Sequence, residues 1–429
     1  MPENLDQLVR AAISAAQEQG DLPAFEVGDV GLERPNDTSH GDWTSTVALR
    51  SAKLAHMKPR DIASAIAKHI EGSKEIDKVE IAGPGFINFY LSTGANNEIF
   101  RTVIEQGADF GKSDVGHGQK VQVEFVSANP TGPMHVGHGR WVALGDSLCR
   151  VLEHTNYQVE REYYINDHGS QMDVFGRSVS KRYLQLFEIM EKDSCDLDGA
   201  AEVLFADRAR YVEDEEDEAP EIHPYMDEFN TDLGGNAYGG DYIIDLARRF
   251  AETDGDRWIE AEADARVTEF RERGYKAMLE TIRQTCHDAR CDFDVWFSER
   301  SLYEKDETGT NAVERAFAAL DKGGYLYRTD DGALWFRSTE FGDDKDRVLV
   351  KTNGEYTYFA SDIAYHWNKF QRVDHVIDIW GADHHGYIAR VNAACEALGY
   401  PGEFEVLLGQ LVNQGCHGPV PRASGRGRR

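Results

Sequence analysis

Residues 121–140 read VQVEFVSANPTGPMHVGHGR, and this stretch decides the fold of the chain around it. Its first part alternates apolar and polar residues, with Val121, Val123 and Phe125 on one face, which predicts a strand over 121–127. A loop rich in Pro and Gly follows, and the apolar spacing over 138–154 then predicts a helix. The histidine motif HVGH therefore lies where a strand passes into the N-terminus of a helix.

This junction is suited to phosphate binding, because free backbone N–H groups and the positive end of the helix dipole meet there. Gly137 lets a ligand approach the backbone closely, and His135 and His138 can donate hydrogen bonds to a phosphate. The motif therefore predicts nucleotide handling. Taken alone, the four residues are also compatible with structural histidines at a helix start.

The composition indicates a globular protein with an acidic surface. The chain has 429 residues, 41% of them hydrophobic, and a net charge of −30. This charge by itself argues against a nucleic-acid binder, because phosphate contacts need Lys and Arg, and it fits solubility, for example in a saline habitat. A tRNA partner would need a local basic surface.

Targeting signals and cysteine usage indicate a cytoplasmic protein. The N-terminus MPENLDQLVR has no apolar signal core, and no apolar run approaches the roughly 18 residues of a membrane span. The six cysteines form no CxxC pair, which fits reduced thiols. We expect a cytoplasmic monomer without a membrane partner.

The order of predicted elements indicates two domains and a tail. Residues 1–115 mix helices with short strands, as in a small α+β domain. From 116 to 413 strands alternate with helices, which predicts an α/β fold with a doubly wound parallel sheet, interrupted by a charged helical insertion at about 192–290. The acidic run at 213–218 is interpreted as a solvated face.

Several carboxylates lie near predicted strand or helix ends, where they could bind a guanidinium group, which presents a planar fork of donors. Glu124 lies on the same strand end as Asn129, and Glu299 lies in DVWFSERS. Tyr358 and Asp362 are four residues apart and share a helix face. Each acidic residue could equally be an ordinary surface charge.

The segment EFVSANPTGPMHVGH, residues 124–138, closely resembles the HIGH-motif segment of arginyl-tRNA synthetases, a class I aminoacyl-tRNA synthetase family. The resemblance extends over residues 1–413. Other segments that resemble the family are HGD at 40–42, IAGPGFINF at 81–89, NDHGSQ at 166–171, DVWFSERS at 294–301, YFASDIAYH at 358–366 and GADHHG at 381–386. The first two resemble the family's additional N-terminal domain, which grips the tRNA, although ordinary turn chemistry would also explain them.

The resemblance implies a Rossmann-like catalytic domain and assigns roles to its residues. His135 and His138 would be catalytic contacts to the ATP phosphates, and ATP would also be bound by Gly137, Asp383 and His384. The sequence Asp-His-His in GADHHG could instead be interpreted as a metal site, but the ligands that would complete such a site do not accompany it. Arginine would be bound by Glu124, Asn129, Glu299, Tyr358 and Asp362.

The implied reaction is the ATP-dependent attachment of L-arginine to tRNA-Arg. The arginine carboxylate attacks the α-phosphorus of ATP, and the terminal 2′-hydroxyl of the tRNA then attacks the arginyl-adenylate. Mg²⁺ would accompany the ATP phosphates. The protein would contribute positioning and charge stabilisation, and the family typically needs bound tRNA for the first step.

After Asn413 the sequence departs from the family, which continues into a KMSK-like lysine loop and an anticodon-binding domain. Residues 414–429 are rich in Gly, Arg and Pro and predict a disordered basic tail. This tail could be a nucleic-acid-binding arm, but we favour a reading-frame accident or premature end. Two other functions remain open: a non-catalytic tRNA- or arginine-binding remnant, and a different HxGH nucleotidyltransferase that adenylates a small carboxylate.

Overall fold

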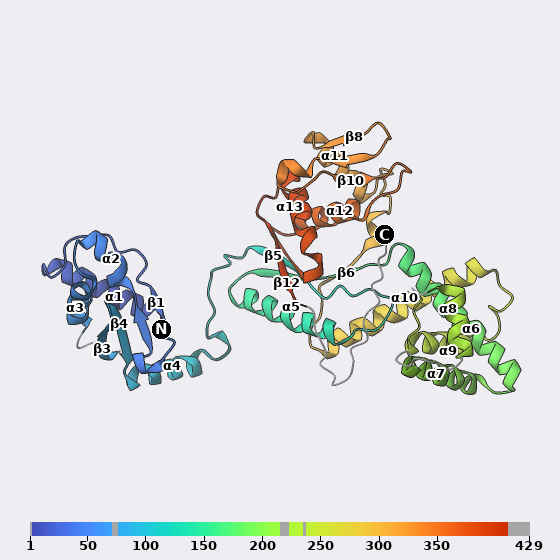
Figure 1. The fold of residues 1–429 in the computed structure, drawn as a ribbon, viewed down its shortest axis with the longest axis horizontal. Coiled ribbons are helices and arrows are strands. Elements are labelled where there is room, and N and C mark those ends of the chain that lie inside the picture. The colour runs from blue at the N-terminus through green and yellow to red at the C-terminus, as the bar shows by residue number, and fades with distance from the viewer. Residues whose placement is uncertain (1, 71–75, 215–222, 235–236, 411–429) are drawn as a thin grey trace. The chain divides into compact units, whose positions relative to one another are not determined.

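The computed structural model describes residues 2–70, 76–214, 223–234 and 237–410, and the chain divides there into two compact units. The first unit is Met1–Lys112 and the second begins at Ser113 (Figure 1). The tail expected at 414–429 and most of the acidic run at 213–218 lie outside the described residues. Within the described ranges, no helix combines the length and apolar character needed to cross a membrane.

The first unit is an antiparallel sheet with the strand order β1-β2-β4-β3, packed against helices. Apolar faces of α1, α2 and α3 enclose its core together with β4. Strands β3 and β4 form a hairpin, because the turn at Gly83-Pro84-Gly85 reverses the chain between them. Its elements are α1 (Pro2–Glu18), β1 (Leu32–Glu33), η1 (Thr38–His40), β2 (Trp43–Ser45), α2 (Val47–Ala55), α3 (Pro59–Ile70), β3 (Ile76–Ala82), β4 (Phe86–Leu91) and α4 (Thr93–Gln106).

The HGD segment of this unit has a structural task. Gly41 has φ +95°, and a Cβ there would lie 2.6 Å from the Phe89 carbonyl oxygen. Asp42 Oδ2 accepts a hydrogen bond of 2.8 Å from the Leu91 backbone N–H. Together these residues fasten the turn before β2 to strand β4, which favours turn chemistry as their role.

The second unit contains the predicted parallel sheet, with the order β12-β11-β5-β6-β7 and every neighbouring pair parallel. The chain enters at β5, continues outward through β6 and β7, and later returns to build β11 and β12 on the other side (Figure 1). The direction of winding therefore changes between β5 and β11, where open α/β sheets bind their ligands. The strands are β5 (Lys120–Glu124), β6 (Gln158–Ile165), β7 (Val295–Ser298), β11 (His375–Gly381) and β12 (Phe404–Gly409).

Helices cover both faces of this sheet. Val121, Val123 and Phe125 pack with α5 (Val136–His154) and with the later turns of α10 (Ala263–Asp288). The opposite face packs against α12 (Tyr358–Phe370) and α13 (Ile388–Ala397). The alternation of β5 thus separates an apolar face toward α5 from a polar face toward α12.

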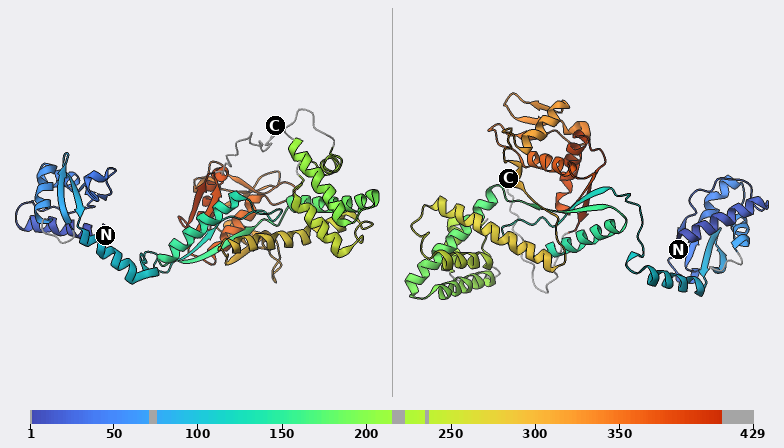
Figure 2. Two further views of the ribbon diagram at one scale, coloured as in Figure 1. Left: turned by 90° about the horizontal axis from the view of Figure 1, so that it is seen from below. Right: turned by 180° about the vertical axis from the view of Figure 1, so that it is seen from behind.

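Two further elements of the second unit lie outside the sheet. A helical body with its own apolar core, green to yellow in Figure 2, is made of α6 (Ser170–Asp193), α7 (Leu197–Asp214), α8 (Pro224–Leu233), α9 (Asp241–Asp254) and the first turns of α10. An antiparallel sheet with the order β10-β9-β8 was not anticipated from the sequence. It is built with η3 (Glu299–Leu302), α11 (Ala312–Lys322), β8 (Leu326–Arg328), β9 (Leu334–Phe336), η4 (Ser338–Phe341) and β10 (Arg347–Val350). The remaining short helices are η2 (Gly107–Asp109) and η5 (Ala382–Tyr387).

Candidate active site

A cavity of about 400 Å³ lies at the carboxyl ends of β5 and β11. This is the point where the winding of the sheet changes direction, the expected place for a ligand. Of the predicted site residues, the cavity brings together Glu124, Asp362 and His384. Other side chains of its wall include Ser127, Tyr164 and Trp380.

The strand predicted over 121–127 is too long, because β5 ends at Glu124 and the backbone then turns sharply at this cavity. Val126 has φ +71° and Ser127 φ +41°, values that a β-branched residue such as Val rarely adopts. The turn places Ser127 Oγ where it donates a 2.8 Å hydrogen bond to Glu124 Oε1 and accepts one of 3.1 Å from Tyr164 N–H. The strained turn therefore holds the Glu124 carboxylate and the end of β6 in one arrangement.

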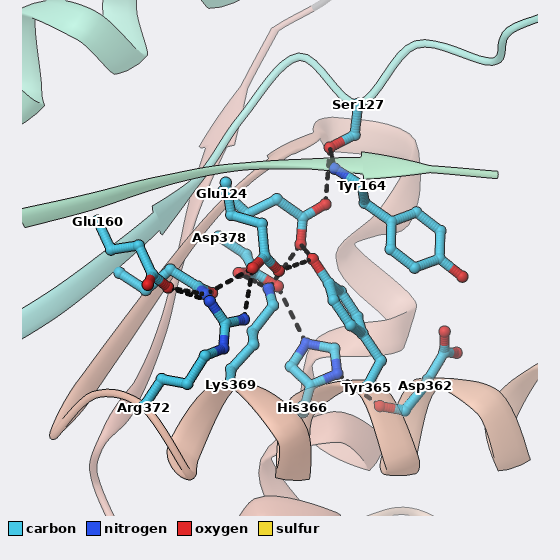
Figure 3. A network of polar contacts seen from close by, with 12 residues as sticks. Glu124, Ser127, Glu160, Tyr164, Asp362, Tyr365, His366, Lys369, Arg372 and Asp378 are labelled. Carbon is cyan, nitrogen blue, oxygen red and sulfur yellow. Dashed lines mark hydrogen bonds and ion pairs between the residues drawn. The ribbon is translucent and has the colours of Figure 1, made fainter. Parts of the chain in front are cut away.

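Behind the cavity, polar side chains fill the space between the sheet and α12, and we call this group the polar layer (Figure 3). Asp378, Glu124 and Glu162 form a row across three adjacent strands, because Glu124 is the register partner of both others. Side chains of α12 face this row. The layer consists of Gln122, Glu124, Glu160, Glu162 and Asp378 from the sheet and Tyr365, His366, Lys369 and Arg372 from α12 and the residues that follow it.

The hydrogen bonds of Tyr365 fix a proton in this layer. Its single hydroxyl hydrogen faces two carboxyl groups, Glu124 Oε2 at 2.8 Å and Glu162 Oε1. One of these contacts must therefore use a carboxyl proton. Burial raises the pKa of Glu162, whereas the charges of Lys369 and Arg372 lower it.

The other end of the layer is a charged cluster. Lys369 Nζ donates to Glu124 Oε2 at 2.5 Å and to Asp378 Oδ1 at 2.6 Å. His366 faces the Asp362 carbonyl oxygen with Nδ1, at 2.7 Å, and Asp378 Oδ2 with Nε2, at 3.0 Å. Burial would raise the pKa of Asp378, but Lys369 and His366 outweigh it and hold that pKa below its usual value. The His366 ring therefore links Asp378 to the backbone of α12 at Asp362.

Glu299 and Asp362, which we call the acidic pair, lie in a different environment. Among the described residues, neither forms an ion pair with a Lys, Arg or His side chain. Burial raises the pKa of Glu299 to about 7, with Asp362 adding to the effect and a hydrogen bond from Tyr164 opposing it. Burial likewise raises the pKa of Asp362 to about 6. His366 and Arg390 oppose the effect of burial on Asp362, but neither forms an ion pair with it, so the acidic pair combines two carboxyl groups with raised pKa values.

The histidine motif forms the N-terminus of α5. His135 Nδ1 accepts the Gly137 N–H at 3.1 Å, and His138 Nδ1 accepts the His135 N–H at 3.2 Å. Both neutral rings can thus donate only through Nε2. Partial burial, with repulsion from His135, lowers the pKa of His138 to about 4, so this ring is neutral at pH 7. A Cβ on Gly137 would lie 2.9 Å from His135 Cε1, so glycine makes room for this ring.

The other predicted residues, which include Glu299 and the histidine motif, lie outside the cavity wall as the described residues define it. Asn129 is exposed, and its Nδ2 donates to Gln171 Oε1 at 3.2 Å. Tyr358 is the first residue of α12, and 76% of its surface is exposed. Asp383 is exposed in η5 beside His384. These three positions and the cavity are therefore not one enclosed site in this structure.

Some residues around the cavity were not predicted from the sequence, because their roles depend on tertiary contacts. Tyr164, Lys369 and Asp378 carried no motif signal, although Lys369 and Asp362 are seven apart and so share a face of α12. Asp167 from the NDHGSQ segment is also buried, and its Oδ2 accepts hydrogen bonds from Ser298 Oγ at 2.6 Å and Tyr275 Oη at 3.0 Å. That segment ties the ends of β6 and β7 to α10.

Two family models match the chain. The model described as arginyl tRNA synthetase N terminal domain matches residues 3–91, and the model described as tRNA synthetases class I (R), catalytic domain, matches residues 100–411. The second match alone covers well over half of the sequence and contains the cavity, the polar layer and the acidic pair.

Individual relatives agree with these matches. The chain is 43% identical to an arginine–tRNA ligase of Oceanobacillus iheyensis over 96% of its own length and 66% of the relative's, and 41% identical to one of Bacillus subtilis over 99% and 68%. It therefore spans about two thirds of the length of these relatives. The solved arginyl-tRNA synthetase of Thermus thermophilus shares the fold, with a TM-score of 0.57, 19% identity, and coverage of 95% of this chain and 66% of that one.

Proposed function

The chain belongs to the arginyl-tRNA synthetase family, and from this membership we propose that it activates L-arginine with ATP and transfers it to tRNA-Arg. The observation that carries the proposal is the acidic pair, of which Asp362 lies in the wall of the cavity and Glu299 interacts with Asp362. Two carboxyl groups with raised pKa values and no ion pair among the described residues, near the switch point of a parallel sheet, suit the guanidinium of a bound arginine.

In this proposal the residues divide into two groups. The acidic pair binds the guanidinium, Glu124 and Asn129 bind the main-chain groups of arginine, and Tyr358 joins the site when substrate is present. His135 and His138 donate to the ATP phosphates through Nε2, at the N-terminus of α5, where the helix dipole is positive. Asp383 and His384 contribute on the nucleoside side. Mg²⁺ would be bound by the ATP phosphates.

The proposed chemistry needs no nucleophile from the protein. The arginine carboxylate oxygen attacks the α-phosphorus of ATP and pyrophosphate leaves; a terminal ribose hydroxyl of the tRNA then attacks the adenylate carbonyl and AMP leaves. The chain positions the reactants and stabilises the charge that develops. A substrate without the guanidinium fork would leave the carboxylates of the acidic pair unpaired in a desolvated cavity, which supplies specificity.

The direct test is an assay of the full chain with arginine, ATP and tRNA-Arg. We expect arginine-dependent ATP–pyrophosphate exchange that requires the tRNA, and charged tRNA as the final product. Arginine that fails to bind in calorimetry, together with absent exchange, would refute the proposal. The monomeric state and cytoplasmic location stay predictions, to be checked by light scattering and cell fractionation.

A further inference from the structure

Lys369 lies behind the cavity and touches groups that form its wall. Its side chain is completely buried, and its ammonium also lies 4.3 Å from the centre of the Tyr365 ring. Glu124 and Asp378 belong to the wall of the cavity, whereas Lys369 is absent from that wall as the described residues define it (Figure 3). A direct contact between Lys369 and a ligand is therefore not part of its role.

Lys369 lies between two carboxylates that would otherwise repel each other. Glu124 and Asp378 are register partners on adjacent parallel strands, whose backbones lie about 4.8 Å apart. Two carboxylates at this spacing in a buried site repel each other, and one would take up a proton or turn away. The Lys369 ammonium, bonded to both, removes this repulsion.

These contacts fix the orientation of the Glu124 carboxylate and leave one of its lone pairs without a hydrogen-bond donor from the described residues. Its Oε2 accepts from Lys369 and Tyr365, and its Oε1 accepts from Ser127. A carboxylate offers about four lone-pair directions, so about one remains on Oε1. Since Glu124 lies in the cavity wall, this remaining direction is available to a cationic group of a ligand.

We propose that Lys369 is a positioning residue for substrate selection: by bridging Glu124 and Asp378 it keeps Glu124 ionised and oriented to receive the α-ammonium group of the amino acid. This inference rests on the proposed function. Lys369 therefore affects recognition of the main-chain amine, whereas the acidic pair recognises the side chain.

Calorimetric titration of the full chain with two ligands tests the inference: arginine, and 5-guanidinopentanoate, which is arginine without its α-amino group. In Lys369→Met we expect arginine affinity to fall roughly 10- to 150-fold, the range for losing a contact with a charged group. Affinity for 5-guanidinopentanoate should stay near that of the wild type, because its guanidinium and carboxylate are unaffected. A merely structural role would weaken both ligands equally, and that result would overturn the inference.

Lys181→Met is a matched control, because Lys181 also bridges two carboxylates, Glu228 at 2.5 Å and Asp232 at 2.6 Å, in the helical body. It should leave the affinity for both ligands unchanged. A loss of arginine selectivity in this control as large as in Lys369→Met would overturn the inference.

A double variant keeps the test decisive if Lys369→Met does not fold. Glu124→Gln with Lys369→Met removes Lys369 and one of its two carboxylate partners, and leaves Asp378 with His366. This variant should bind arginine no more weakly than Glu124→Gln alone, because in the inference Lys369 acts on the α-ammonium group through Glu124. A further loss in the double variant would overturn the inference. Failure of the wild-type chain to bind arginine would instead refute the proposed function, and the inference with it.

Discussion

The polar layer and the acidic pair are both built from carboxyl groups with little access to water, yet their chemistry is opposite. In the polar layer, Glu124 and Asp378 share the Lys369 ammonium, and burial is offset by ion pairs. In the acidic pair, Glu299 and Asp362 have no such cation among the described residues, and their pKa values are raised to about 7 and about 6. Lys369 of the polar layer and Asp362 of the acidic pair both belong to α12, so this helix contributes to both groups.

This difference indicates which carboxyl groups stabilise the fold and which are available to a ligand. A carboxylate whose cation comes from the protein contributes to the fold, and removing that cation leaves a buried charge uncompensated. A buried carboxyl group without a paired cation lowers the stability of the free protein, and a bound cationic ligand can restore that stability. The acidic pair is therefore the part of the site that a guanidinium completes.

The largest expected effect comes from breaking the polar layer. Lys369→Met should lower the free energy of unfolding by about 3–5 kcal/mol, the usual cost of removing one partner of a buried ion pair. Urea denaturation followed by circular dichroism measures this loss. Lys181→Met should lose less, because its partners Glu228 and Asp232 are 40% and 50% exposed. Equal losses would contradict the contrast between a buried and an exposed bridge.

A smaller effect, on binding rather than folding, should follow from Asp362→Asn. Arginine affinity should fall by about 1.5–3 kcal/mol, since a charge-assisted contact is removed, while ATP affinity stays unchanged. The free energy of unfolding should not fall, because the substitution also removes repulsion with Glu299. Calorimetry with each ligand and urea denaturation measure the three quantities.

Asp198→Asn is a suitable control for this variant, since Asp198 is an exposed carboxylate paired with Arg248 in the helical body. It should change neither ligand affinity. If Asp362→Asn weakened arginine and ATP equally, its assignment to the guanidinium would be wrong.

The smallest effect is a dependence of arginine binding on pH. The raised pKa values mean that the folded protein holds protons on the acidic pair that the unfolded chain releases. This contribution to stability is fully present below the ordinary carboxyl pKa values, decreases as the pH rises, and is lost above about 6 to about 7. Arginine needs the ionised pair, so its affinity should increase over the same range and level off above it. Titrations near neutral pH in two buffers of different ionisation enthalpy should reveal proton release on binding; equal apparent enthalpies in both buffers would contradict this prediction.

Much of the fold could be predicted from local patterns. The helix expected over 138–154 begins within two residues of α5, because long apolar periodicity and nearby turn residues define it, and the expected parallel sheet is confirmed. The antiparallel strands β8, β9 and β10 were missed, since each is three or four residues long and too short to show a period. β7 was missed for the same reason.

The candidate site was less accessible to sequence reasoning. The segments that carry Glu124, Asp362 and His384 could be found by their resemblance to a family, and these residues do share the cavity. No pattern marked Lys369 or Tyr164, because a lysine on a helix and a tyrosine in a strand have ordinary local roles. Their importance arises from partners more than a hundred residues away, such as Glu124 for Lys369.

By itself, the sequence of 121–140 determined a strand, a loop rich in Pro and Gly and a helix N-terminus with two histidines, because these depend on side-chain period and on residues close in the chain. Only the tertiary structure decided what covers the polar face of that strand. Gln122 and Glu124 could have faced water; instead α12 covers them and supplies the lysine that neutralises Glu124. The protonation and direction of a carboxylate depend on groups brought near by folding, and local sequence does not contain them.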